Sequence, residues 1–149
     1  MTSIRPARAA DGPRLFDIWR RAVDATHDFL HAQDRDAITA EAAAFLPRSS
    51  AWLATDADDR AVGFMLVDRA HMDALFVDPH WHGQGVGRRL VRHGLELHPT
   101  MTTDVNEQNV GAISFYERMG FARTGRSDQD GQGRPYPLLH LRYAPEPEG

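Results

Sequence analysis

The spacing of apolar and polar residues predicts alternating helices and strands along the chain. Apolar residues three or four positions apart predict four helices: one from Asp11, as N-cap, to about residue 24, a second that ends before Pro47, and two more at 85–97 and 109–120. Short apolar runs bounded by turn residues predict a first strand that begins at residue 4. Further strands are predicted at 51–55, 61–67, 71–77, 100–105, 121–127 and 138–143. The resulting order is β-α-α-β-β-β-α-β-α-β-β.

The segment 71–90 predicts a strand, a glycine-rich loop and a helix N-terminus in succession. Three glycines, Gly83, Gly85 and Gly87, lie at the entrance to the helix. The first N–H groups of a helix have no internal partner, and the helix dipole favours negative charge beside them. Glycine has no Cβ atom to keep a phosphate away from these amides. The sequence therefore predicts a phosphate-binding site at this loop.

Two common phosphate-binding motifs do not fit this loop. From Gly83 and Gly85, the dinucleotide fingerprint G-x-G-x-x-G requires a third glycine at position 88, which is Arg88. A nucleotide P-loop requires Gly-Lys followed by Ser or Thr, and this tripeptide does not occur in the chain.

Two segments resemble the signatures of the GNAT acetyltransferases. Residues 82–87, His-Gly-Gln-Gly-Val-Gly, resemble the pyrophosphate loop Q/R-x-x-G-x-G/A, with His82 where the family usually has Gln or Arg. Residues 109–121 resemble the later signature N-x-x-A-x-x-F/L-Y-x-x-x-G-F. With the segments 25–30 and 135–139, the resemblance to small bacterial GNAT proteins covers residues 3–143.

This resemblance implies a fold and an activity. The implied fold is α/β (α+β): one GNAT domain over residues 1–145, with a mixed, mostly antiparallel sheet flanked by helices on both faces and a frayed tail at 146–149. The implied activity is transfer of the acetyl group from acetyl-CoA to a primary amine by direct attack. The absence of cysteine agrees with direct attack. The alternative is a catalytically silent acyl-CoA-binding or regulatory domain on the same fold.

The resemblance also implies roles for three side chains in catalysis. Tyr116 matches the general acid of the family, and a phenol holds its proton at neutral pH; the alternative is simple packing, which Phe115 beside it is expected to supply. His71 and Asp73 share one face of their strand and are candidates for the general base. Their alternative role is a polar pair at a strand end.

Further residues are candidates for binding the two substrates. For acetyl-CoA they are Leu75, Phe76, Val77, His82, Gly83, Gln84, Gly85, Val86, Gly87, Arg88 and Asn109. For the acceptor they are His27, Phe29 and Asn106. Helix capping is the alternative role for Asn109 and Asn106. His80 and His82 have no third ligand nearby in sequence, so no metal site is expected.

Composition narrows the partners. The net charge of −4 over 149 residues argues against a nucleic-acid binder. The sequence has no apolar run typical of a signal peptide or a membrane span, so a cytoplasmic protein is expected. Its expected oligomeric state is a monomer or a homodimer. The acidic, aromatic and histidine residues near the expected site suit a cationic amine, either a small molecule or a protein or peptide. The pairs Arg20-Arg21 and Arg88-Arg89 are expected on solvated faces.

Overall fold

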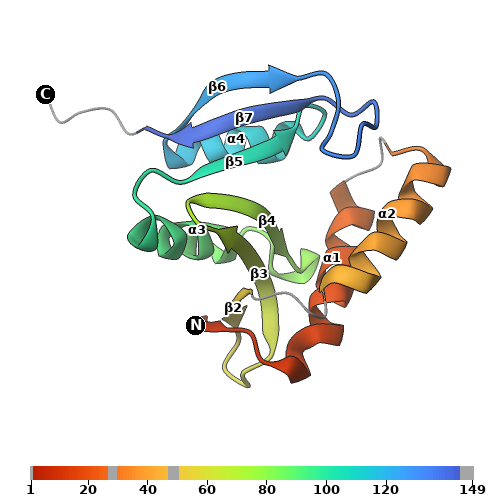
Figure 1. The fold of residues 1–149 in the computed structure, drawn as a ribbon. Helices are drawn as coiled ribbons and strands as arrows, with labels where there is room; N and C mark the ends of the chain where they lie inside the picture. Colours follow the sequence, from red (N-terminus) through yellow and green to blue (C-terminus); the bar gives the residue numbers. More distant parts are fainter. Residues whose placement is uncertain (1, 27–29, 47–50, 145–149) are drawn as a thin grey trace, which may run out of the picture. The chain divides into compact units, whose positions relative to one another are not determined.

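The computed structural model describes residues 2–26, 30–46 and 51–144 (Figure 1). In chain order the strands and helices are β1 (Ser3–Pro6), α1 (Gly12–Thr26), α2 (Ala32–Phe45), β2 (Trp52–Thr55), β3 (Ala61–Asp68), β4 (His71–Val77), α3 (Val86–Leu97), β5 (Thr102–Asn106), α4 (Val110–Met119), β6 (Phe121–Ser127) and β7 (Leu138–Tyr143). The order predicted from the sequence is confirmed. Short 3-10 helices at Ala9–Asp11 and Pro79–Trp81 were not predicted.

The strands form a mixed seven-stranded sheet in the order β1-β2-β3-β4-β5-β7-β6. β4 pairs with β5 in parallel, and the pairs β1–β2, β2–β3, β5–β7 and β6–β7 are antiparallel. The chain divides into two compact units, Met1–Val67 with Ala74–His93, and Asp68–Asp73 with Gly94–Gly149. β4 contributes residues to both units, and a single domain over 1–145 stays a prediction.

In the first unit, α1 packs on the strands through the apolar face that the sequence predicts. Leu15, Ile18 and Trp19 of α1 are buried in one core with Leu53 of β2 and Phe64 of β3. These positions on α1 are three and one residues apart, so they lie on one side of the helix.

Helix α3 covers the other face of β3, where Gly63 allows a close approach. A Cβ atom on Gly63 would lie 2.9 Å from Val86 Cγ1 and 3.2 Å from the Phe76 carbonyl oxygen. Successive strand residues point to opposite faces, so Gly63 faces α3 while Phe64 faces α1. The predicted helices on both faces are therefore confirmed for this strand.

In the second unit, α4 covers one face of the strands β5, β7 and β6. Thr103, Leu139 and Leu141 are buried on this face, and Tyr116 of α4 is buried beside Thr103. Asn109 caps the start of α4, and Gly120 ends it with a left-handed φ of 109°. The sequence predicted the positions of both ends.

Two predictions about charged residues were wrong. Asp11 does not cap α1; its carboxylate accepts hydrogen bonds from the Arg8 backbone N–H at 2.7 Å and from Arg5 Nη1 at 2.9 Å. Arg21 is not a solvated residue, because its Nη1 lies 2.8 Å from Oδ2 of Asp78, a carboxylate that is only 2% exposed.

Asp78 is the centre of a buried ion-pair cluster at the end of β4. It accepts hydrogen bonds from Arg14 Nη2 and Arg21 Nη1, both at 2.8 Å, and from the His80 backbone N–H at 3.0 Å. Burial alone would raise the pKa of Asp78, but the His80 N–H and the two guanidinium groups hold it below its ordinary value. The cluster thus holds α1 to the turn that precedes the glycine loop.

We expect Asp78→Asn to lower the free energy of unfolding by about 3–5 kcal/mol at pH 7, because it leaves two partly buried guanidinium groups without their carboxylate. Since folding lowers the pKa of Asp78, its stabilising contribution is complete above the ordinary carboxyl pKa of about 4 and is lost as the pH falls further. Urea denaturation of both proteins between pH 7 and pH 3 measures the difference, which should narrow at the acid end.

The matched control is Asp17→Asn. Asp17 also pairs with Arg14, at 2.7 Å, but its side chain is 36% exposed, so we expect a loss of no more than about 1 kcal/mol. Equal losses from the two substitutions would show that burial of Asp78 has no special weight.

Candidate active site

The glycine loop between β4 and α3 has the backbone that a phosphate site requires. Gly83 and Gly85 have φ angles of 77° and 80°, and no atom lies within 4 Å of the Cβ position at either residue. Val86 and Leu90 are fully buried and hold the first turns of α3 in place. The loop therefore presents open backbone at a fixed helix N-terminus.

The side chains around this loop bond to the nearby backbone. His82 Nε2 lies 3.2 Å from the Val77 carbonyl oxygen, and Gln84 Nε2 donates to the His80 carbonyl oxygen at 3.2 Å. Arg88 is exposed, as predicted. Arg89 is also exposed, as predicted, and its Nη1 donates a hydrogen bond to Thr2 Oγ1 at 2.8 Å.

The end of β4 is less buried than the apolar run indicated. Leu75, Phe76 and Val77 are all half-buried. The ring of Phe76 packs near that of Phe64, with 5.7 Å between their centroids. Contact of these three residues with acetyl-CoA stays a prediction.

Asn109 and Asn106 both accept a hydrogen bond from a nearby backbone N–H, but only Asn109 caps a helix. Asn109 Oδ1 accepts a hydrogen bond from the Ala112 N–H at 3.2 Å, and Asn106 Oδ1 accepts one from the Gln108 N–H at 2.9 Å. The capping alternative is thus observed for Asn109 but not for Asn106, and their contacts with acetyl-CoA and with the acceptor stay predictions.

Tyr116 is a buried phenol with a polar partner. It is 7% exposed and packs edge-on against Phe115 and Phe121, with ring centroids 5.2 and 5.4 Å away. Burial raises the pKa of Tyr116 above its ordinary value, and the hydrogen bond with Thr103 only partly offsets this. The hydroxyl therefore keeps its proton at all physiological pH values. The expectation that Phe115 alone supplies the packing was wrong.

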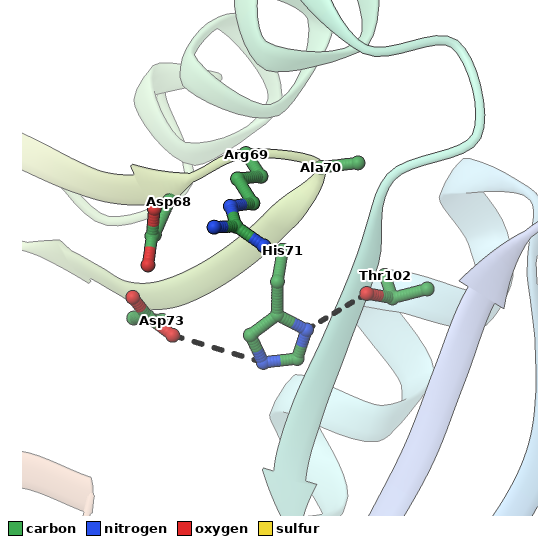
Figure 2. Close-up of a pocket in the computed structure, with 6 residues that line it drawn as sticks. All are labelled: Asp68, Arg69, Ala70, His71, Asp73 and Thr102. Atoms are coloured by element: carbon green, nitrogen blue, oxygen red, sulfur yellow. Dashed lines mark hydrogen bonds and ion pairs between the residues drawn. The ribbon is translucent and has the colours of Figure 1, made fainter.

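A small pocket lies beside His71 at the start of β4 (Figure 2). Its volume is about 360 Å³, and its lining includes His71, Asp73 and Thr102. His71 Nδ1 lies 2.7 Å from Thr102 Oγ1, while its Nε2 lies 3.8 Å from Asp73 Oδ1 (Figure 2). His71 and Asp73 lie close together as predicted, but the 3.8 Å between them is too long for a hydrogen bond.

The nearer carboxylate belongs to Asp104, on the neighbouring strand β5. Its Oδ2 lies 3.4 Å from His71 Nε2, and its Oδ1 lies 2.6 Å from His140 Nδ1. His140 Nε2 in turn lies 2.7 Å from Ser127 Oγ. Sequence reasoning missed His140 and Ser127, because only the pairing of β5, β6 and β7 brings them to Asp104.

Some predictions fall outside the described residues. His27 and Phe29 belong to the segment 27–29, so their contact with an acceptor stays a prediction. Within the ranges that the structure describes, no three His, Cys, Asp or Glu side chains group as metal ligands. Among the described helices, none has the length and apolar character needed to cross a membrane.

The order of strands, the open glycine loop before α3 and the capped helix that carries Tyr116 define an acyltransferase fold. A family profile described as "Acetyltransferase (GNAT) domain" matches residues 20–136, and the chain belongs to the GNAT family of N-acetyltransferases. The resemblance seen in the sequence is thereby confirmed.

Similar proteins cover nearly the whole chain. The peptidyl-lysine N-acetyltransferases YjaB of Salmonella typhimurium and Escherichia coli are both 52% identical to it, over 96% and 95% of this chain and 99% and 96% of their own lengths. The solution structure of apo-form YjaB from Escherichia coli matches with a TM-score of 0.93 and 50% identity, covering 97% of this chain and 99% of that one. The chain is therefore an N-acetyltransferase.

Proposed function

We propose that this enzyme transfers the acetyl group of acetyl-CoA to the side-chain amine of lysine in a protein or peptide. The main support for acetyl-CoA as the donor is the open backbone of Gly83 and Gly85 at the start of α3. The support for lysine as the acceptor is that two relatives, each 52% identical to this chain, are named peptidyl-lysine N-acetyltransferases.

The glycine loop fits the pyrophosphate of acetyl-CoA. In the proposal, the amides of residues 82–87 bind the pyrophosphate, and the positive end of the α3 dipole stabilises its charge. Arg88 is exposed in the first turn of α3 and adds a positive charge there. The remaining proposed contacts come from Leu75, Phe76 and Val77 along the end of β4, and from Asn109.

The polar side chains beside the pocket suit a cationic acceptor. The side chains of Asp73 and Asp104 are 54% and 36% exposed, so they attract an ammonium group without first having to be uncovered. Before it attacks, the ammonium must lose a proton, and an imidazole is a suitable acceptor. We assign this role to His71, whose Nδ1 faces the Thr102 hydroxyl, with Asp73 as an additional charge.

Direct attack by the amine forms the new C–N bond and breaks the C–S bond, which leaves a thiolate that needs a proton. The Tyr116 phenol holds its proton at neutral pH, so a proton is available when the thiolate leaves; burial, which raises its pKa, makes it a weaker acid than a free phenol. We therefore assign Tyr116 as the general acid. The chain has no cysteine to form a thioester intermediate, which agrees with direct attack.

An acceptor screen with acetyl-CoA, read by release of free thiol, tests the proposal as a whole. We expect thiol release with lysine-containing peptides and acetyl-lysine in their mass spectra. Acetylation of small amines alone would replace the acceptor class. Tight binding of acetyl-CoA without transfer to any amine would favour the silent acyl-CoA-binding domain.

Gly85→Val should weaken acetyl-CoA binding at least about tenfold, because the branched side chain would occupy the space in which the pyrophosphate approaches the amides. Isothermal titration calorimetry with acetyl-CoA measures the effect. The matched control is Gly133→Val, since Gly133 has a φ of 77°, close to the 80° of Gly85, and no atom within 4 Å of its Cβ position.

Both valines incur the same backbone strain, of about 1–2 kcal/mol, so thermal denaturation should show similar losses of stability. Only the valine at position 85 should alter affinity. Equal affinities in the two variants would remove the loop from the binding site.

Tyr116→Phe should lower the rate of acetyl transfer by roughly 10²–10⁴-fold while acetyl-CoA affinity stays unchanged, because it removes one hydroxyl and little volume. Single-turnover kinetics with an active acceptor isolate the chemical step. Tyr143→Phe serves as the control, since Tyr143 packs at the other side of Phe121. A wild-type rate in Tyr116→Phe would exclude Tyr116 as the acid.

A further inference from the structure

Five polar side chains form one continuous chain across four neighbouring strands. In order they are Thr102, His71, Asp104, His140 and Ser127, from strands β5, β4, β5, β7 and β6. Asp104 lies at the centre, and on each side of it an imidazole leads to a hydroxyl. The two arms differ in their distance from Asp104, which is 2.6 Å from His140 but 3.4 Å from His71. Asp104, His140 and Ser127 are called the tighter arm.

The partners determine where the protons lie in the tighter arm. A carboxylate only accepts hydrogen bonds, so the neutral His140 imidazole donates its Nδ1–H to Asp104. Its Nε2 then carries the lone pair and accepts the hydroxyl proton of Ser127, at 2.7 Å. This places the basic nitrogen of His140 directly behind the Ser127 hydroxyl.

The backbone of β6 makes room for this arrangement. His140 lies opposite Asp104 on one side and Gly125 on the other, and the register of β6 shifts between Arg123 and Gly125. Gly125 has no side chain, and a Cβ atom there would lie 3.4 Å from His140 Cδ2. The imidazole can therefore extend along β6 to Ser127.

Both hydrogen bonds of the tighter arm are short, at 2.6 Å to Asp104 and 2.7 Å to Ser127. A distance of 2.6 Å to a carboxylate is typical of a strong charge-assisted hydrogen bond, whereas 3.4 Å lies beyond the usual range for N–H···O. Asp104 therefore holds the His140 ring in place more closely than it holds the His71 ring.

We propose that His140, reached through the Ser127 hydroxyl and oriented by Asp104, is a second proton acceptor for the acceptor amine beside His71. This inference rests on the proposed acetyl transfer to an amine. Asp104 is a positioning residue, because it acts through the imidazole.

The step conserves protons and electrons. An N–H bond of the substrate ammonium breaks, and its proton goes to Ser127 Oγ while the Ser127 hydroxyl proton passes to His140 Nε2. The freed lone pair of the amine then attacks the thioester carbon. His140 is left as an imidazolium beside the Asp104 carboxylate, and it later returns its proton to solvent.

Several charged groups surround the two imidazoles. Asp73 and Asp104 face His71, and Asp68 and Arg69 line the same pocket. Asp104 faces His140 from β5, and the alternation of β7 puts Arg142 on the same face of the sheet. None of these charged neighbours changes in the variants of the kinetic comparison described next.

The experiment compares His140→Gln, Ser127→Ala and His71→Gln across pH 6 to 9, with an active lysine peptide and saturating acetyl-CoA. A glutamine can hydrogen bond at position 140 but cannot take up a proton. Because the relay accepts a proton only through a neutral imidazole, the wild-type rate should fall at low pH. We expect His140→Gln and Ser127→Ala to lower kcat about 10²-fold at pH 7 and to change the acid side of the profile.

Thr124→Val is the matched control, because the Thr124 hydroxyl donates to the His140 backbone carbonyl oxygen at 3.3 Å rather than to the ring. Its rate and pH profile should equal those of the wild type. Calorimetry should give the same acetyl-CoA affinity in every variant. If His140→Gln keeps the wild-type profile and only His71→Gln alters it, His71 acts alone and the inference is overturned.

A second measurement does not depend on acetyl transfer. In ¹⁵N-labelled protein, long-range ¹H–¹⁵N spectra of the histidine rings should show neutral His140 with its proton on Nδ1, and Asp104→Asn should change this preference. A His140 that carries its neutral proton on Nε2 would overturn the relay. Failure of the wild type to acetylate any amine would instead count against the proposed function, so the two failures are distinguishable.

Discussion

The buried carboxylate of Asp78 is the constraint on which the first unit depends. It is 2% exposed and joins residues far apart in sequence: Arg14 and Arg21 of α1, and the turn after β4. A charge buried this deeply is tolerated only when ion pairs and hydrogen bonds satisfy it. Arg14 also donates from Nε to the Ala61 carbonyl oxygen at 2.9 Å, so the same guanidinium fixes α1 to the start of β3. The turn that Asp78 organises leads directly into the glycine loop.

Local rules explain why much of the fold and the glycine loop could be predicted. The caps of α4, Asn109 and Gly120, act on their own helix ends, and the glycines of the loop require only the backbone freedom of that residue type. By contrast, the pairing of Asp78 with Arg21 joins residues 57 positions apart. The sequence therefore predicted a turn at Asp78 but left Arg21 among the solvated residues.

The chain of polar side chains from Thr102 to Ser127 was even harder to predict from the sequence. Alternation along β4 correctly placed His71 and Asp73 on one face, because it depends on a single strand. The distances from Asp104 to His71 and to His140 depend on which strands are neighbours, and β7 lies between β5 and β6 although it follows both in sequence. A strand that inserts between two earlier ones has no local signal, so His140 and Ser127 could not be found from spacing alone.

Side chains that alternate along strand β5 place the proposed acid and the proposed bases on opposite faces of the sheet. Thr103 points to the face on which Tyr116 is buried, while Thr102 and Asp104 point to the opposite face and bond to His71 and His140. A phenol holds its proton at neutral pH, and burial raises the pKa of Tyr116 further, whereas the histidines on the opposite face offer imidazole nitrogens that can accept a proton. Acid and base on opposite faces of one strand can serve the same reaction only if the thioester lies level with the sheet, at a strand end or between two strands. The parallel register of β4 and β5 covers two positions and reaches only Met72 and Thr103. The proposed chemistry therefore requires the thioester to reach the level of β5 rather than to lie on either face of the sheet.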